Sequence, residues 1–187
     1  MSEARVYVNG KEACFWPFGY NSFHCDVTGL LNADGKNNVL AVRLENRPQS
    51  SRWYPGAGLY RNVRLVTTER VHVPVWGTQL TTPHVSAEYA SVRLRTTIRN
   101  AGDADVRIST DIIAPDGKIV ARKDNSRKIN HGQPFEQNFL INAPSLWSPE
   151  TPYLYKAVSK IYVDGKQTDE YTTRFGIRSI EIIADKG

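Results

Sequence analysis

Glycine and proline are spread along the whole of this chain, and they limit the length of any regular element. The sequence holds 13 glycines and 10 prolines in 187 residues. The longest stretch without either runs from residue 84 to residue 101. Because proline breaks a helix and glycine weakens one, long helices have little room. The spacing of glycine and proline therefore favours short strands joined by turns.

The turn signals repeat a single theme. Asn-Gly or Asp-Gly stands directly before lysine at Asn9-Gly10, Asp34-Gly35, Asp116-Gly117 and Asp164-Gly165. Both central positions of a type I′ turn need a positive φ, and these residues adopt it with little strain. The four signals predict several β-hairpins.

Apolar and polar side chains alternate between the turns. Residues 92–99 place Val92, Leu94, Thr96 and Ile98 on one face and Arg93, Arg95, Thr97 and Arg99 on the other. A period of two puts the first set in a core and the second in water. Residues 84–101 could instead form a helix, but the second half is rich in β-branched residues, so a strand is favoured. The other expected strands are 106–112, 39–44, 63–67, 153–163 and 170–175.

These strands predict an all-β chain in two parts. Residues 70–187 hold about seven candidate strands, as in an immunoglobulin-like sandwich, although the antibody Cys…Trp…Cys pattern is missing. Residues 1–69 hold about four or five, which is few for an independent sheet domain. We therefore expect one domain at 1–69 and a second at 70–187.

Charge and hydropathy exclude two classes of partner. The chain has 24 Lys and Arg against 19 Asp and Glu, a net charge of +5, and the positive residues are scattered. Nucleic-acid binding needs a clustered basic stripe. No apolar stretch approaches the ~20 residues of a membrane helix, and the opening residues carry no signal-peptide core. We expect neither nucleic acid nor a membrane as partner.

Cys14 and Cys25 are the only cysteines. Two cysteines make neither a disulfide framework nor a four-ligand zinc site. We interpret them as small buried apolar residues. A single disulfide in an exported protein, or a metal site that includes His24, is the alternative. We expect no metal and no cofactor.

Several motifs, taken in order, resemble one enzyme family. The first half of the chain holds Val6–Lys11, Gly19–Phe23, Asp26–Thr28 and Ser50–Val63, and the second half holds Leu146–Tyr155 and Arg174–Arg178. This ordered set is similar to the family 2 glycoside hydrolases, the group of β-galactosidases and β-glucuronidases. The resemblance covers nearly the whole chain.

The resemblance implies a fold and a supporting role. It implies the C-terminal part of a jelly-roll, sugar-binding-like domain followed by an immunoglobulin-like sandwich, with catalysis in a (β/α)₈ barrel downstream. Retaining glycosidases need two carboxylates about 5–5.5 Å apart. No Asn-Glu acid/base motif occurs here, and Glu136, Glu150 and Glu170 stand in strand or turn contexts. We expect no catalytic residue, and we expect the barrel to be the main partner.

Arg52, Trp53 and Tyr54 are the candidate site residues, at the rim of the substrate pocket that the resemblance implies. Aromatic faces stack on sugar rings, and a guanidinium donates paired hydrogen bonds to hydroxyls or carboxylates. Packing in a core or at an interface is the alternative for the two aromatic residues. An inter-domain salt bridge is the alternative for Arg52.

Two other functions stay open. A stand-alone carbohydrate-binding module is suggested by Trp16, Trp53 and Tyr54, and an adhesive or scaffolding sandwich would bind no ligand. A partial jelly roll leaves unpaired edges and an uncovered apolar face, which predicts a homodimer or partial disorder. The resemblance favours a periplasmic or secreted parent over a cytosolic one.

Overall fold

The computed structural model describes residues 2–32, 36–46, 48–49, 58–99, 102, 104–128 and 133–181. Within these residues the chain is all-β, as predicted, with ten strands and one short 3₁₀ helix. The strands fall into two compact units, Met1–Leu65 and Val66–Gly187. The sequence places the boundary after residue 69, a few residues further along.

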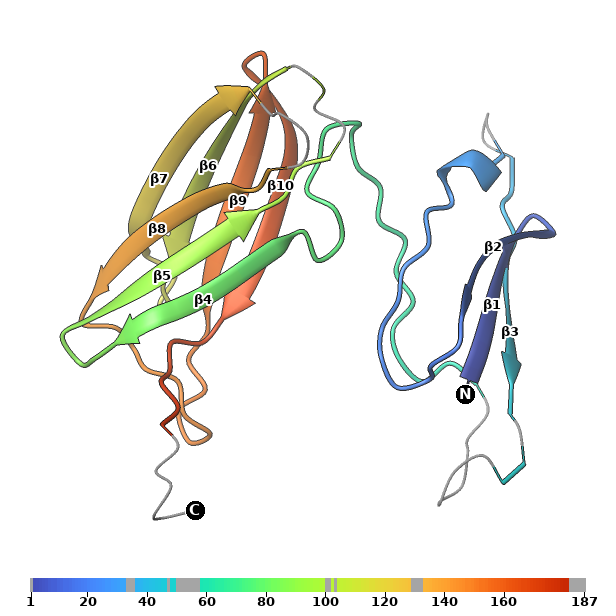
Figure 1. The fold of residues 1–187 in the computed structure, drawn as a ribbon, viewed down its shortest axis with the longest axis horizontal. Helices are drawn as coiled ribbons and strands as arrows, with labels where there is room; N and C mark the ends of the chain where they lie inside the picture. The colour runs from blue at the N-terminus through green and yellow to red at the C-terminus, as the bar shows by residue number, and fades with distance from the viewer. Residues whose placement is uncertain are drawn as a thin grey trace. The chain divides into compact units, whose positions relative to one another are not determined.

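The first unit contains an antiparallel sheet in the order β2-β1-β3 (Figure 1). Its strands are β1 (Ser2–Val8), β2 (Lys11–Trp16) and β3 (Leu40–Glu45), with the 3₁₀ helix η1 at Thr28–Leu30. Asn9 and Gly10 join β1 to β2 with φ values of 51° and 80°, the two positive values that a type I′ turn requires. The described part of this unit has three strands, fewer than the sequence predicts.

One expected strand of this unit is wrong. Residues 62–69 have no strand conformation, and Val63, Leu65 and Val66 are exposed. The segment is rich in β-branched residues, which favour strands only where a neighbouring strand supplies hydrogen bonds and packing. No strand in the described part of the chain pairs with it.

The interpretation of the cysteines is also wrong. Cys14 and Cys25 form a disulfide, and both residues are half-buried rather than buried. Their Cα atoms lie 5.9 Å apart, inside the range that a disulfide spans. The bond closes the loop that follows β2, because the two cysteines are 11 residues apart in sequence.

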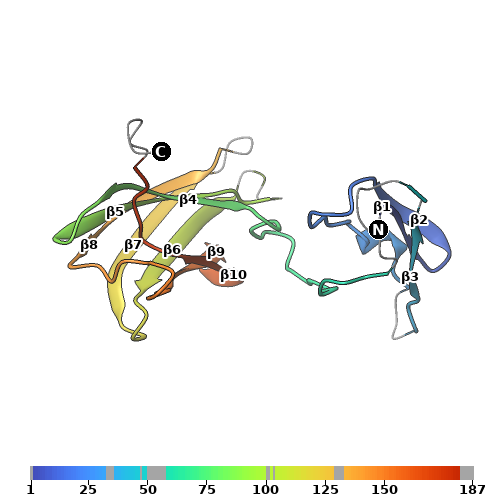
Figure 2. The same ribbon diagram turned by 90° about the horizontal axis from the view of Figure 1, so that it is seen from below.

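The second unit is a two-layered antiparallel sandwich (Figure 2). One sheet has the order β10-β9-β6-β7 and the other β4-β5-β8. The bounds are β4 (Thr78–Val85), β5 (Tyr89–Thr96), β6 (Asp105–Ile113), β7 (Ile119–Lys128), β8 (Phe135–Asn142), β9 (Tyr155–Val163) and β10 (Lys166–Phe175). Seven strands in two facing sheets confirm the immunoglobulin-like architecture.

Two of the predicted turns join neighbouring strands of the four-stranded sheet. Asp164 and Gly165, with φ values of 49° and 79°, connect β9 to β10. The loop between β6 and β7 contains Asp116-Gly117, and the Gly117 N–H donates to the Ala114 carbonyl at 2.9 Å. Asp34-Gly35 lies outside the described residues.

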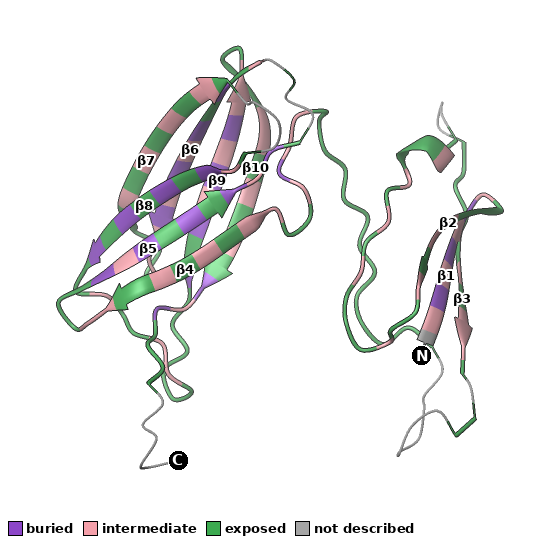
Figure 3. Ribbon diagram, in the orientation of Figure 1, coloured by how far each residue is buried: buried purple, intermediate pink, exposed green. Residues whose placement is uncertain are grey.

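The predicted alternation is confirmed along the central strands (Figure 3). Val92, Leu94, Thr96 and Ile98 are buried, whereas Arg93, Arg95 and Arg99 are exposed. The same alternation in β6 buries Val106, Ile108, Thr110 and Ile112. The inward residues of the two sheets therefore form one interior.

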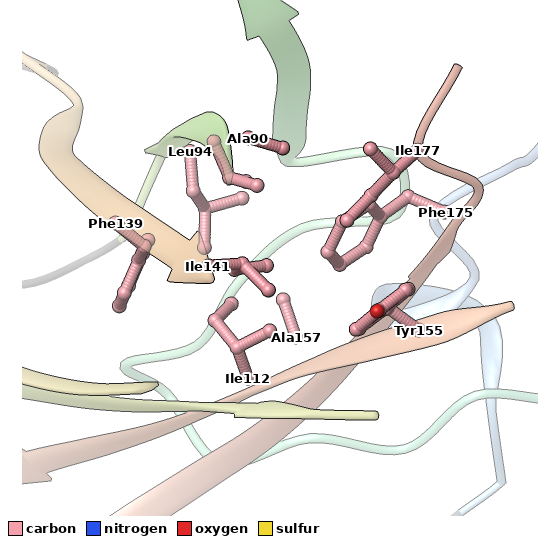
Figure 4. Packing of buried hydrophobic residues seen from close by; sticks show 10 residues of the cluster. Ala90, Leu94, Ile112, Phe139, Ile141, Tyr155, Ala157, Phe175 and Ile177 are labelled. Carbon is pink, nitrogen blue, oxygen red and sulfur yellow. The ribbon is translucent and has the colours of Figure 1, made fainter. Parts of the chain in front are cut away.

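That interior has two apolar clusters. The larger one (Figure 4) consists of Ala90, Val92, Leu94, Ile112, Phe139, Ile141, Tyr155, Ala157, Phe175 and Ile177. The smaller one consists of Val73, Ile98, Val106, Ile108, Phe135 and Ile161. A layer of four buried polar residues lies between the two apolar clusters along the strands. It consists of Thr96 in β5, Thr110 in β6, Gln137 in β8 and Ser159 in β9.

Candidate functional site

Arg52, Trp53 and Tyr54 lie outside the described residues. Their place at the rim of a substrate pocket therefore stays a prediction. The structure describes three other surfaces. They are the disulfide-closed loop of the first unit, one end of the sandwich, and a hollow on the outer face of the β4-β5-β8 sheet.

The disulfide-closed loop gathers aromatic side chains. The rings of Trp16 and Phe23 stack at a centroid distance of 5.7 Å with an interplanar angle of 8°. The indole N–H of Trp16 donates to Asn21 Oδ1 at 2.8 Å, which fixes the loop against the end of β2. Phe18 and Tyr20 pack on each other at 5.6 Å, and both are exposed.

Glu136, Glu150 and Glu170 all face solvent. Glu136 lies 3.8 Å from the Nε atoms of Arg93 and Arg95, and Glu170 lies 4.0 Å from Lys160. Glu150 is exposed. A retaining glycosidase places one carboxyl as acid beside a second as nucleophile, and these three side chains lie instead in strand or turn positions facing solvent, as expected.

Three carboxyl groups in the described part of the chain have lowered pKa values. Hydrogen bonds from Arg122, Lys118 and Ser86 lower the pKa values of Asp111, Asp116 and Glu88 respectively. A general acid at neutral pH needs a raised pKa, which comes from burial or a neighbouring negative charge. These three groups are held ionised instead.

The described residues hold no group of three or more His, Cys, Asp or Glu side chains arranged to bind a metal ion. They also contain no helix with the length and apolar character needed to cross a membrane.

One end of the sandwich exposes large apolar side chains. We call Leu146, Tyr153, Leu154 and Ile180 the end surface; their exposed fractions run from 40% to 73%. Loop 143–154 and the segment after β10 leave the same end of the sandwich in Figure 1. The Trp147 N–H donates to the Ile177 carbonyl at 2.8 Å, and the Arg178 guanidinium lies 4.9 Å from the Trp147 ring centre. These contacts hold the two segments together.

A hollow of about 240 Å³ lies on the outer face of the β4-β5-β8 sheet. It is lined by Trp76, Gly77, Thr78, Gln79, Arg95, Thr97 and Pro134. A smaller hollow of about 130 Å³ adjoins it and shares Gln79 and Arg95 with it. The sequence patterns did not predict this surface. The exposed position of Arg95 in the alternating strand was the one available signal.

The comparisons with known proteins agree on one family. The sequence profile described as "Glycosyl hydrolases family 2" matches residues 73–178. The chain is 39% identical to the β-galactosidase BoGH2A of Bacteroides ovatus, over 98% of this chain and 22% of that protein. It is 31% identical to a β-glucuronidase of Formosa agariphila, over 98% of this chain and 21% of that protein.

A solved structure of a family member is also similar to this chain. The glycosyl hydrolase family 2 member of Bacteroides cellulosilyticus matches with a TM-score of 0.87 and 31% identity, over 100% of this chain and 24% of that one. The chain thus spans about a fifth to a quarter of the length of these relatives.

Proposed function

This chain belongs to the Glycosyl hydrolases family 2, and on that premise we propose that it is a non-catalytic part of a β-glycosidase, most similar to the β-galactosidases. The parent enzyme would hydrolyse terminal β-glycosidic bonds in a (β/α)₈ barrel. The sandwich would hold that barrel in place. The proposal is supported by relatives that are several times longer than this chain and by the solvent-facing positions of Glu136, Glu150 and Glu170.

The observation that carries the supporting role is the end surface. Leu146, Tyr153, Leu154 and Ile180 are four large apolar side chains that face solvent, and a group of such side chains marks interaction surfaces. The remainder of the enzyme is the occupant that we propose, because the part matched here is only 22% of the length of the β-galactosidase BoGH2A. Burial of this surface would then stabilise the barrel and the sandwich together.

The test uses the enzyme made from the full reading frame that contains this chain. We expect Tyr153→Ser with Leu154→Ser to lower its Tm and kcat together, since docking buries both side chains. Val75→Ser is the control, because Val75 is an exposed apolar residue just before β4, whereas loop 143–154 follows β8 at the other end of that sheet. Unchanged Tm and kcat in the double variant would refute the docking role.

Arg52, Trp53 and Tyr54 belong to the same proposal as residues of the substrate-pocket rim. Support comes from their motif in the sequence. In the full enzyme, Trp53→Ala should raise KM more than it lowers kcat, because a stacking face binds ground state and transition state alike. An effect on Tm with no effect on KM would instead indicate packing.

Carbohydrate binding by the first unit is the second candidate function. The exposed aromatic pair Phe18 and Tyr20, held in the disulfide-closed loop, favours it. Calorimetry of the chain with galactose and galactan oligomers separates the candidates. Sub-millimolar binding that is lost on Tyr20→Ala or Trp53→Ala supports the module, and no binding supports the structural role alone.

Compartment and assembly complete the proposal. The Cys14–Cys25 disulfide supports an oxidising compartment, and hence a periplasmic or secreted parent. Among the described strands, β2 and β3 are the edges of the sheet in the first unit. Leu40 at the start of β3 and Val39 just before it are exposed. A homodimer through these edges predicts a concentration-dependent sedimentation coefficient for this chain, which Leu40→Lys should abolish.

A further inference from the structure

The hollow beside Trp76 combines an exposed aromatic residue with arginine side chains. Trp76 is 58% exposed and stands at its edge. Gln79 and Arg95 line both the larger and the smaller hollow, so the two form one continuous depression across β4 and β5. Thr81 and Thr97 add hydroxyl groups along it.

Trp76 occupies a backbone conformation that large residues avoid. Its φ is 58°, and the turn that contains it is closed by the Gly77 N–H donating to the Pro74 carbonyl at 2.7 Å. Turns that need a positive φ at their third residue normally use Gly or Asn, and a bulky residue there is strained. The Trp76 N–H donates to the Tyr171 hydroxyl at 3.2 Å, which helps hold the turn. Strain of this kind gathers at binding sites.

Arg93 and Arg95 supply positive charge on the same face. Their side chains are 52% and 48% exposed, and they share the single carboxylate of Glu136 at 3.8 Å from each Nε atom. That separation is too long for a hydrogen bond. Within the described residues neither guanidinium makes a hydrogen bond. Two guanidinium groups against one carboxylate leave one positive charge and a set of planar donors for a ligand.

We infer that this depression, which we call the Trp76 site, binds an acidic saccharide, a sugar ring that carries a carboxylate. The ring would stack on Trp76, and the carboxylate would accept paired hydrogen bonds from Arg95. Arginine matches a carboxylate in this two-bond geometry. The side-chain amide of Gln79 and the threonine hydroxyls would contact the sugar hydroxyls. The site lies on the sandwich, goes beyond the supporting role, and does not depend on it.

The test measures binding of tri-galacturonate to the 187-residue chain by calorimetry, with neutral galactotriose as the matched sugar. We expect millimolar affinity for the acidic trimer, since the site is shallow, and at least tenfold weaker binding of the neutral one. Arg95→Gln should weaken binding of the acidic trimer about tenfold. Trp76→Asn should do the same, and asparagine tolerates the positive φ of the turn.

Lys156→Gln is the control, because it removes one exposed positive charge from the other sheet. It should leave affinity unchanged, and far-UV circular dichroism should show each variant folded. Absence of binding to both trimers overturns the inference. So does equal weakening by Lys156→Gln and Arg95→Gln, which would indicate attraction by net charge alone. These readouts are independent of hydrolytic activity and of docking at the end surface.

Discussion

The Thr110 hydroxyl donates a hydrogen bond to Oε1 of Gln137 at 2.7 Å, across the interior of the sandwich. Thr110 also shares a hydrogen bond with Ser159 at 2.9 Å, and the Gln137 side-chain amide donates to the Lys123 carbonyl and to Asn125 Oδ1, both at 3.1 Å. A buried polar group is costly unless it is paired. The network therefore sets which strands face each other between the two apolar clusters.

Thr110→Val should lower the free energy of unfolding by about 1–3 kcal/mol, because it leaves buried polar atoms of Gln137 and Ser159 without a partner. Urea denaturation measures the change. Thr172→Val, an exposed threonine on β10, is the matched control and should stay within about 0.5 kcal/mol of the parent chain. Equal stability of the two variants would show that the network does not stabilise the sandwich.

Reduction of the Cys14–Cys25 disulfide should destabilise the first unit by about 3 kcal/mol, the chain-entropy value for a loop of this length. Exposed Phe18 and Tyr20 lie inside the loop, so chymotrypsin should cut there faster after reduction. The variant with Cys14→Ser and Cys25→Ser should not respond to reductant. Two reactive thiols in the untreated chain would disprove the disulfide.

Asp111→Asn should reduce stability at neutral pH but not in acid. The pKa of Asp111 is lowered chiefly by its hydrogen bonds from Arg122, one of them at 2.8 Å. Because the folded-state pKa lies below the unfolded value, the ion pair stabilises the fold above the unfolded pKa. That stabilisation is lost as the pH falls through the folded pKa.

Urea midpoints of the parent chain and of Asp111→Asn should accordingly differ at neutral pH and converge in acid. Asp105→Asn lies on the same strand and has no ion pair among the described residues, so its effect should be small at both pH values. A constant difference between the Asp111 variant and the parent across the whole range would contradict the ion-pair account.

Gly176→Ala should destabilise the sandwich by about 1–3 kcal/mol through crowding. A Cβ at Gly176 would lie 2.9 Å from Cγ and 3.0 Å from Cδ1 of Trp147. The Trp147 ring would have to move, and its contact with Arg178 would move with it. Gly29→Ala meets no atom within 4 Å and should be close to neutral. Thermal unfolding of the two variants makes the comparison.

The strands of the sandwich were predictable because their apolar and polar side chains alternate with a period of two residues. Residues 92–98 and 106–112 alternate strictly, and burial follows that alternation even at Thr96 and Thr110. Gln137 and Ser159 were not predicted to be buried, because their burial depends on partners from other strands. Residues 63–67 failed as a strand for a related reason, since composition reports β propensity but not whether a neighbouring strand exists.

The candidate surfaces were less predictable than the fold. The sequence predicts Leu154 within the strand 153–163, but in the structure it precedes β9 and is exposed. Its exposure depends on the path of loop 143–154 at the end of the sandwich. The disulfide depends on the folding of the loop after β2, which brings Cys25 back to Cys14. Arg95 was correctly placed on the solvent face, but the hollow beside it requires Trp76 from a different segment.

The central claim, that these residues support hydrolysis without performing it, is tested most directly by assaying the purified chain on nitrophenyl β-galactoside and β-glucuronide. We expect no release of nitrophenol above the buffer rate, because the proposal places the two catalytic carboxylates in the (β/α)₈ barrel. Hydrolysis that disappears on Glu136→Gln, Glu150→Gln or Glu170→Gln would contradict the claim.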